Sequence, residues 1–149
     1  MEKSATLLMN ENLQHAKELL LLRGYKFVII NGRNILHSNR RGISTLLQLL
    51  REDPSMLPGS FVADRLIGKA AALLLTHGGV EELYAETISE SAIHYLRKMG
   101  ITHYYGRKVP YIVNHNHTGL CPLEELCSDI EISEEGYRIL SNWNTLFEN

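Results

Sequence analysis

Two short apolar runs, residues 27–30 and 35–36, flank an Asn31-Gly32 pair, and this arrangement limits the fold more than any other feature of the chain. Asn-Gly is the pair most typical of a tight β-hairpin turn, because both residues tolerate a positive φ. The sequence therefore predicts an antiparallel hairpin here, made of two neighbouring strands of one sheet.

Helical periodicity surrounds the hairpin. Residues 10–24 begin with a capping asparagine, place apolar side chains on one face and end at a glycine, which predicts a helix. Residues 42–53 carry apolar side chains at the i, i+3, i+4 and i+7 positions of a second helix. Residues 66–76 are apolar nearly all round, which predicts a buried helix that ends at Gly78-Gly79.

The second half of the chain alternates between strand and helix patterns. The segments 80–87, 101–106 and 109–114 read as short strands, and 89–100, 121–127 and 133–147 read as helices, with Ser89 as an N-cap. A hairpin followed by strand–helix–strand units predicts a mixed sheet with helices on its faces. We therefore predict one α/β domain over residues 1–149, a three-layer α/β/α sandwich.

Composition excludes several classes of function. The formal net charge is −2, which argues against a nucleic-acid-binding or membrane-surface protein. No apolar run is long enough to cross a bilayer, and the first residues do not resemble a signal peptide. The 2 cysteines, without a secretory context, indicate free thiols in a reducing compartment. We therefore expect a cytoplasmic protein.

Four strings resemble a small bacterial family of unknown function to which a cytidine-deaminase-like fold is assigned. They are VADRLIGKAAALLL at 62–75, YAETISESAIHYL at 84–96, VPYIVN at 109–114 and CPLEEL at 121–126. The predicted order of helices and strands is also similar to that fold. The resemblance implies a fold and supplies no activity, because the family has none established.

The deaminase comparison can be tested on the residues themselves. A zinc deaminase requires H-x-E or C-x-E at the start of its first central helix and P-C-x-x-C at the start of the next. In this comparison the first of these helices is expected to begin at Val62-Ala63-Asp64, so valine replaces the metal ligand and Asp64 replaces the glutamate. Residues 87–92 contain neither cysteine nor histidine. The sequence therefore predicts no zinc-dependent deamination, no metal and no cofactor.

A ligand pocket is still expected where strand ends meet helix starts. Near these places the sequence has Asp64, Lys69, Ser89 and Ser91, and the resembling strings add Asn114 and Glu124. We interpret these six residues as candidate ligand-binding residues for a small polar, anionic or nucleotide-like molecule. The alternative is that Lys69, with its neighbour Arg65, is a solvated charge and that Ser89 is only a helix cap.

The segment 114–127, NHNHTGLCPLEELC, allows three interpretations. A zinc site would use His115, His117, Cys121 and Cys127, but C-x5-C spacing on a helix places the thiols on different faces. A reactive Cys121 is more plausible, because a thiol at a helix N-terminus is favoured as thiolate, although the following glutamates oppose this.

The third interpretation of this segment is structural. Pro122 would occupy the first helical position, and Glu124 would reach back to the N–H group of Cys121 as in a capping box. Leu123 and Leu126 would enter the core, and Cys127 would behave as a small buried apolar residue.

The main functional hypothesis is a small-molecule-binding protein whose pocket unites Asp64, Ser89 and Cys121, with Asp64 and Cys121 as candidate catalytic residues. One alternative is a cysteine-dependent transferase that uses Cys121. A further alternative is a non-catalytic interaction protein, such as a homodimer, whose interface uses Tyr104, Tyr105, Tyr111 and Trp143. The sequence predicts no nucleic-acid or membrane partner.

Overall fold

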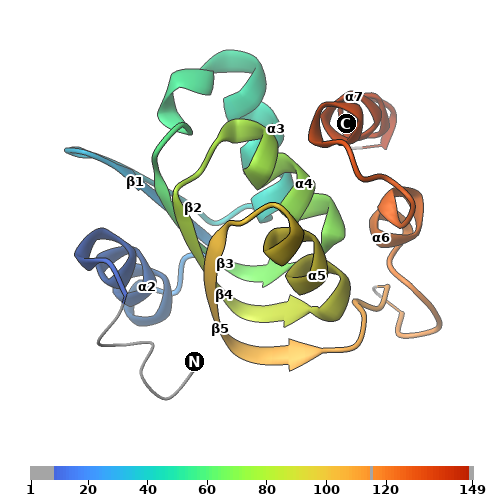
Figure 1. Cartoon of the computed structure of the whole chain (residues 1–149), viewed down its shortest axis with the longest axis horizontal. Coiled ribbons are helices and arrows are strands. Elements are labelled where there is room, and N and C mark those ends of the chain that lie inside the picture. Colours follow the sequence, from blue (N-terminus) through green and yellow to red (C-terminus); the bar gives the residue numbers. More distant parts are fainter. Residues whose placement is uncertain (1–8, 115, 148–149) are drawn as a thin grey trace.

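The structure is a computed structural model and describes residues 9–114 and 116–147. Figure 1 shows the arrangement of its helices and strands. In chain order they are α2 (Glu11–Arg23), β1 (Phe27–Asn31), β2 (Asn34–Ser38), α3 (Gly42–Glu52), the short 3-10 helix η2 (Pro54–Met56), β3 (Phe61–Ile67), α4 (Lys69–Gly78), β4 (Glu82–Ser89), α5 (Glu90–Lys98), β5 (Thr102–Val109), α6 (Pro122–Cys127) and α7 (Ser133–Phe147).

The strands form one mixed sheet of five strands in the order β2-β1-β3-β4-β5. Strand β1 is antiparallel to both β2 and β3, whereas β3, β4 and β5 are parallel. The predicted hairpin is confirmed, because Asn31 pairs with Asn34 and Gly32 adopts a φ of 62° in the turn between them.

Helices cover both faces of this sheet, which confirms the three-layer α/β/α sandwich (Figure 1). Helix α2 covers one face, where Leu13, Ala16 and Leu20 pack in a cluster with Val28 and Ile30. The other face carries α3, α4 and α5, and α6 and α7 pack against the outer side of α4. Helix α4 is therefore buried nearly all round, as its sequence predicts.

Helix starts follow the predicted caps. The side chain of Asn10 accepts a hydrogen bond from the N–H of Asn12 at the start of α2, and Gly24 ends this helix with a φ of 73°. The side chain of Ser89 accepts a hydrogen bond from the N–H of Ala92 at the start of α5. These local interactions fix where the helices leave the sheet.

Two predicted segments are wrong. Residues 61–67 form strand β3, and the following helix begins at Lys69 rather than near residue 62 or 66. Strand β3 is largely buried and therefore rich in apolar residues. Only Gly68 separates this strand from the buried helix α4, so the sequence of the two elements resembles one long apolar helix. Residues 109–114 do not form a strand, since β5 ends at Val109 and Val113 forms only an isolated bridge with Leu120.

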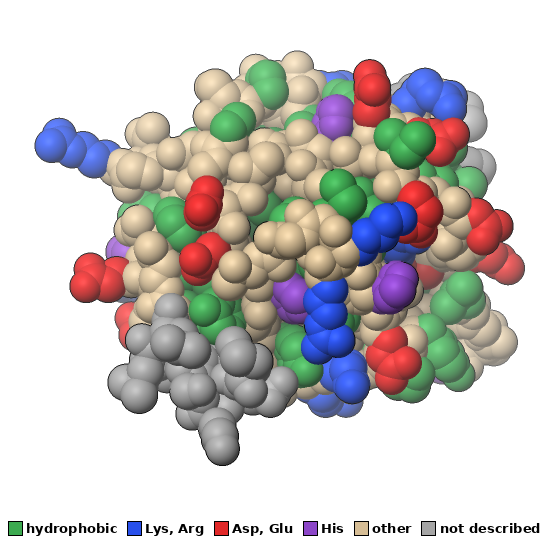
Figure 2. Space-filling view, in the orientation of Figure 1, with side chains coloured by type: hydrophobic (Ala, Val, Ile, Leu, Met, Phe, Trp, Pro, Cys, Tyr) green, Lys and Arg blue, Asp and Glu red, His purple; other side chains and the backbone are tan. Residues whose placement is uncertain are grey.

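The surface is mixed in character. Figure 2 shows acidic and basic side chains interspersed over one face, with small groups of hydrophobic side chains between them. Within the described residues, no helix has the length and apolar character needed to cross a membrane.

Candidate ligand-binding cavity

A cavity of about 330 Å³ lies where the N-terminal ends of α3, α4 and α6 meet the C-terminal half of β3. Its lining comes from five separate parts of the chain. The lining residues are Gly24, Lys26, Arg41, Gly42, Ile43, Asp64, Arg65, Leu66, Gly68, Ile112, Cys121 and Glu124.

Asp64 is the most unusual of these residues. It lies in the middle of the sheet, paired with Phe27 on β1 and with Ala85 on β4, and it is only 2% exposed. Its Oδ1 accepts one long hydrogen bond of 3.4 Å from the N–H of Leu66. Its Oδ2 has no hydrogen-bond partner among the residues that the structure describes.

Burial raises the pKa of Asp64 from its ordinary value of 3.8 to about 7, because desolvation disfavours the carboxylate. The backbone N–H groups of Leu66 and Arg65 and the charge of Arg41 lower the pKa, but they do not offset the desolvation. A carboxyl group with such a pKa changes between its protonated and ionised forms near neutral pH.

Gly42, the first residue of α3, makes this position of Asp64 sterically allowed. A Cβ atom on Gly42 would overlap the Asp64 carboxyl group, so the absence of a side chain lets the carboxyl group lie against the start of the helix. The role of Gly42 could not be predicted from the sequence, because its contact is with a strand more than twenty residues away.

Glu124 has a different role. Its Oε1 accepts a hydrogen bond of 2.8 Å from the N–H of Lys69, and its Oε2 accepts one of 3.2 Å from the N–H of Ala70. These N–H groups belong to the first turn of α4 and have no acceptor within the helix itself. The N-cap residue Gly68 has no side chain that could accept hydrogen bonds from them. A Cβ atom on Gly68 would overlap the Glu124 carboxylate. Glu124 therefore caps α4 from another helix.

The predicted capping box at Cys121 is thus wrong. The N–H of Cys121 donates to the carbonyl oxygen of Ile112 at 2.9 Å, and Glu124 points to α4. Leu123 is buried as expected, but Leu126 is 41% exposed and does not enter the core.

The two cysteines differ in environment. Cys121 is the N-cap residue of α6, is partly exposed and lines the cavity. Cys127 is fully buried, which confirms its prediction as a core residue, and burial raises the pKa of its thiol to about 12. Of the two thiols, Cys121 is therefore the one that solvent and a bound molecule can reach.

Lys69 does not line the cavity, although its N–H group is hydrogen-bonded to the lining residue Glu124. Its side chain is buried and turns away, donating to the carbonyl oxygen of Ser128 at 3.2 Å and to Glu131 at 2.9 Å. Lys69 and Lys98 lower the pKa of Glu131 to about 2. Lys69 is therefore neither a solvated charge nor a side chain of the cavity, and it instead holds the segment after α6 against α4.

Three other candidates also lie outside the cavity lining. Ser89 is buried and caps α5, with its Oγ 3.1 Å from the Oγ of Ser91. Asn114 accepts a hydrogen bond from the N–H of Thr118 at 2.9 Å, within its own loop. The structure therefore brings Asp64, Cys121 and Glu124 together, and it does not bring Ser89, Ser91 or Asn114 to them.

The zinc interpretation of segment 114–127 involves His115, which lies outside the described residues. Among those that are described, no group of three or more His, Cys, Asp or Glu side chains is placed to hold a metal ion. Helices α3, α4 and α6 begin at the cavity, and none of them begins at residues 62–64, where the deaminase comparison placed its first helix start.

Two basic residues that line the cavity, Lys26 and Arg41, were not predicted from the sequence as site residues. Lys26 and Arg41 are exposed lining residues, and neither forms an ion pair within the described part of the chain. Arg65 is committed elsewhere, because its guanidinium group donates to the carbonyl oxygens of Tyr25 and Leu20 and pairs with Glu86 at 3.0 Å. Surface lysines and arginines are too common for their spacing alone to indicate a site.

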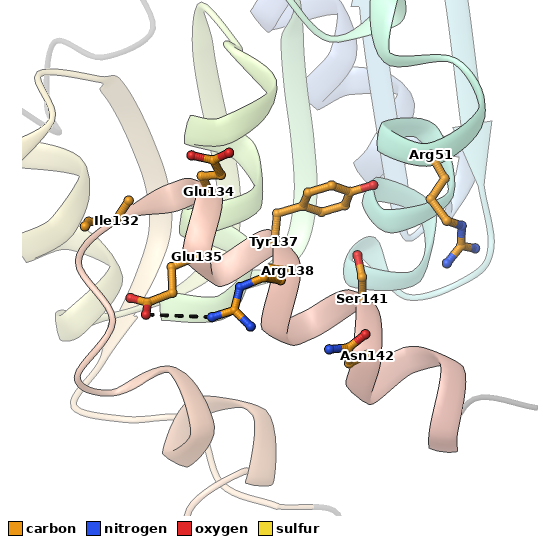
Figure 3. A pocket seen from close by; sticks show the side chains of 8 residues that line it. All are labelled: Arg51, Ile132, Glu134, Glu135, Tyr137, Arg138, Ser141 and Asn142. Carbon is orange, nitrogen blue, oxygen red and sulfur yellow. Dashed lines mark ion pairs between the residues drawn. The ribbon is translucent and has the colours of Figure 1, made fainter.

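A wider hollow of about 680 Å³ lies between α7 and the end of α3 (Figure 3). Figure 3 shows Arg51 facing it from α3 and Tyr137 and Ser141 facing it from α7. Its charged residues are exposed, and Arg138 and Glu135 form only a 3.9 Å ion pair on the surface of α7. The smaller cavity at Asp64 is therefore the better candidate site, since it contains buried titratable groups.

Comparison with known proteins identifies the family. The family model described as "Domain of unknown function (DUF1893)", also labelled TM1506, matches residues 15–143. The chain belongs to the DUF1893 family. All residues that line the Asp64 cavity fall within the part matched by the DUF1893 model.

A solved structure agrees with this assignment. The crystal structure of a DUF1893 family protein (TM1506) from Thermotoga maritima is 27% identical and superposes with a TM-score of 0.81. The similarity covers 90% of this chain and 91% of that one. No curated protein matches the chain. The resemblance to a family of unknown function is thus confirmed, and its description names no ligand or reaction.

Proposed function

We propose that this DUF1893 protein binds a small polar or nucleotide-like molecule in the cavity between α3, α4 and α6. The observation that carries the proposal is the buried carboxyl group of Asp64, whose Oδ2 has no partner among the described residues. An unsatisfied buried polar atom costs about 1–3 kcal/mol. A ligand that completes its hydrogen bonding would recover this free energy on binding.

The shape and lining of the cavity support the same proposal. Its volume of about 330 Å³ is near the lower end of the range for small-molecule sites, roughly 300–1,000 Å³. Ile43, Leu66 and Ile112 provide apolar surface. A few polar groups within an apolar lining are typical of a site that orients a small ligand.

Thermal denaturation with a panel of nucleobases, nucleosides and nucleoside monophosphates tests this function. A binding compound should raise the melting temperature and also slow alkylation of Cys121 by iodoacetamide, because Cys121 lines the cavity. The shift should disappear in Gly68→Ala, because the added Cβ would overlap the carboxylate of the lining residue Glu124, and persist in Gly119→Ala, where an added Cβ meets no atom within 4 Å. If no compound on the panel gives either effect, the proposed function is wrong.

A cysteine-dependent transferase is a second candidate, because Cys121 is partly exposed within the same cavity. In such a reaction the thiolate attacks an acyl donor, a thioester forms as the leaving group departs, and an acceptor then takes the acyl group. Iodoacetamide alkylation of the wild type against Cys121→Ser, followed by mass spectrometry over a pH series, tests this function. A rate that rises only above pH of about 8.5, as for an ordinary thiol, would contradict it.

A further inference from the structure

We propose that the ligand of this cavity is an amino-bearing nitrogen heterocycle with an anionic tail, which points its N–H group toward Asp64 and its tail toward Lys26 and Arg41. This inference rests on the proposed function and adds the chemical class and orientation of the ligand. An aminopurine or aminopyrimidine nucleoside monophosphate has this chemistry.

The first step concerns the two helix starts. Exposed N–H groups at a helix N-terminus attract anions such as phosphate. In this cavity, carboxyl groups of the protein already lie at both starts: Glu124 accepts the N–H groups of Lys69 and Ala70, and Asp64 lies against Gly42. A phosphate that entered this part of the cavity would meet two acidic groups instead of free donors. This part therefore disfavours the anionic part of a ligand.

The second step concerns the remaining acceptor. Both oxygens of Glu124 accept hydrogen bonds from α4, whereas Oδ2 of Asp64 has no partner within the described residues. An amino or ring N–H group would supply the missing donor. Ile43 and Ile112 provide apolar surface against which a flat ring can pack. In its ionised form, which prevails above pH of about 7, Asp64 therefore favours a heterocycle with a donor over a ligand that has only acceptors.

The third step concerns the exposed side of the cavity. Lys26 and Arg41 are exposed lining residues without an ion pair in the part of the chain that the structure describes, while Arg65 is held by Glu86 and two carbonyl oxygens. Two unpaired cations can bind a phosphate or a carboxylate. The acidic groups of the cavity are therefore buried and Lys26 and Arg41 are exposed, although the charge of Arg41 also reaches Asp64. This arrangement matches a ligand with a donor for the buried carboxyl group and an anion for the exposed cations.

Isothermal titration calorimetry with matched compounds tests this orientation. The probes are adenosine and cytidine 5′-monophosphates, the two nucleosides, and the two ribosides in which a methyl group replaces the amino group. At pH 8, where Asp64 is mostly ionised, loss of the amino group should weaken binding about tenfold or more in the wild type, as expected for a hydrogen bond to a charged group. In Asp64→Asn, whose fold is checked by circular dichroism, the amino compound and its methyl analogue should bind more equally.

The anionic tail is tested separately. Removal of the phosphate should weaken binding several-fold and make binding less dependent on salt. The double variant Lys26→Gln/Arg41→Gln should bind the monophosphates equally weakly, whereas its binding of the nucleosides should not change. Arg33→Gln, an exposed arginine in the hairpin turn, is the matched control and should change nothing.

The outcomes separate this inference from the proposed function. If the amino compounds and their methyl analogues bind the wild type equally, the donor assignment is refuted although the cavity still binds small molecules. If the double variant binds the monophosphates as the wild type does, the tail is misplaced. If none of the six compounds binds and none protects Cys121 from alkylation, both the orientation and the proposed function fail.

Discussion

Replacement of Asp64 by asparagine should change how the stability of the protein depends on pH. Burial raises the pKa of this carboxyl group from 3.8 to about 7, so the folded state holds the proton more tightly than the unfolded state. Between these two pH values the folded chain binds more protons than the unfolded chain. The contribution of Asp64 to the free energy of unfolding is therefore largest below pH 3.8, falls as the pH rises and levels off above about pH 7.

The magnitude follows from the same two values. A pKa difference between 3.8 and about 7, at about 1.4 kcal/mol for each pKa unit, corresponds to about 4 kcal/mol in total. About 3 kcal/mol of this change falls between pH 4.5 and pH 8, a range that is convenient for equilibrium unfolding. Asparagine does not titrate, so Asp64→Asn should lack this part of the pH dependence.

Urea unfolding measures this difference, and the fluorescence of Trp143, the single tryptophan of the chain, reports the transition. The wild type should lose about 3 kcal/mol more than Asp64→Asn between pH 4.5 and pH 8. Asp129→Asn, a change at an exposed aspartate, is the control and should follow the wild-type profile. Parallel profiles of wild type and Asp64→Asn would refute the argument that Asp64 is buried with an unsatisfied carboxyl oxygen.

Two other predictions concern the groups around Asp64. Gly68→Ala should destabilise the protein by about 1–3 kcal/mol in urea unfolding, because the new Cβ overlaps the Glu124 carboxylate and removes the cap of α4, whereas Gly119→Ala should cost less than about 0.5 kcal/mol. Under native conditions, mass spectrometry should find one iodoacetamide adduct, on Cys121, and a second on Cys127 only after denaturation. Equal stability of the two glycine variants, or native alkylation of Cys127, would contradict the packing described for this region.

Local signals explain why much of the fold could be predicted from the sequence. The hairpin at Gly32, the cap of α5 at Ser89 and the end of α2 at Gly24 each depend on residues within a few positions of one another. The boundary between β3 and α4 could not be predicted, because a buried strand and a buried helix have similar apolar sequences. Only Gly68 marks the change, and a glycine within an apolar run has several interpretations.

The candidate site was predictable only in part, for a related reason. Asp64 and Cys121 were predicted because each stands at an expected helix start, which is correct for Cys121 and wrong for Asp64 in β3, whereas the partners of Glu124 and Lys69 depend on tertiary contacts. Glu124 caps a helix that begins 55 residues earlier in the chain, and the side chain of Lys69 binds Glu131, 62 residues later. Sequence spacing predicted that Glu124 would cap its own helix and that Lys69 would be solvated. In the structure both residues instead bind partners that are distant in the sequence.

Gly42, the first residue of α3, and Gly68, the N-cap residue of α4, account for the unusual charge arrangement of the cavity. A helix that starts with Ser, Thr, Asp or Asn caps itself. The N-cap residues here are Arg41 for α3 and Gly68 for α4, and neither makes a side-chain capping hydrogen bond. Because Gly42 and Gly68 have no side chain, carboxyl groups from β3 and α6 occupy the space at these two helix starts. Glu124 uses both of its oxygens as a cap, while Asp64 keeps one oxygen without a partner in the described residues. The same packing that stabilises α4 therefore leaves one acceptor beside the cavity, and this acceptor determines which ligands the cavity favours.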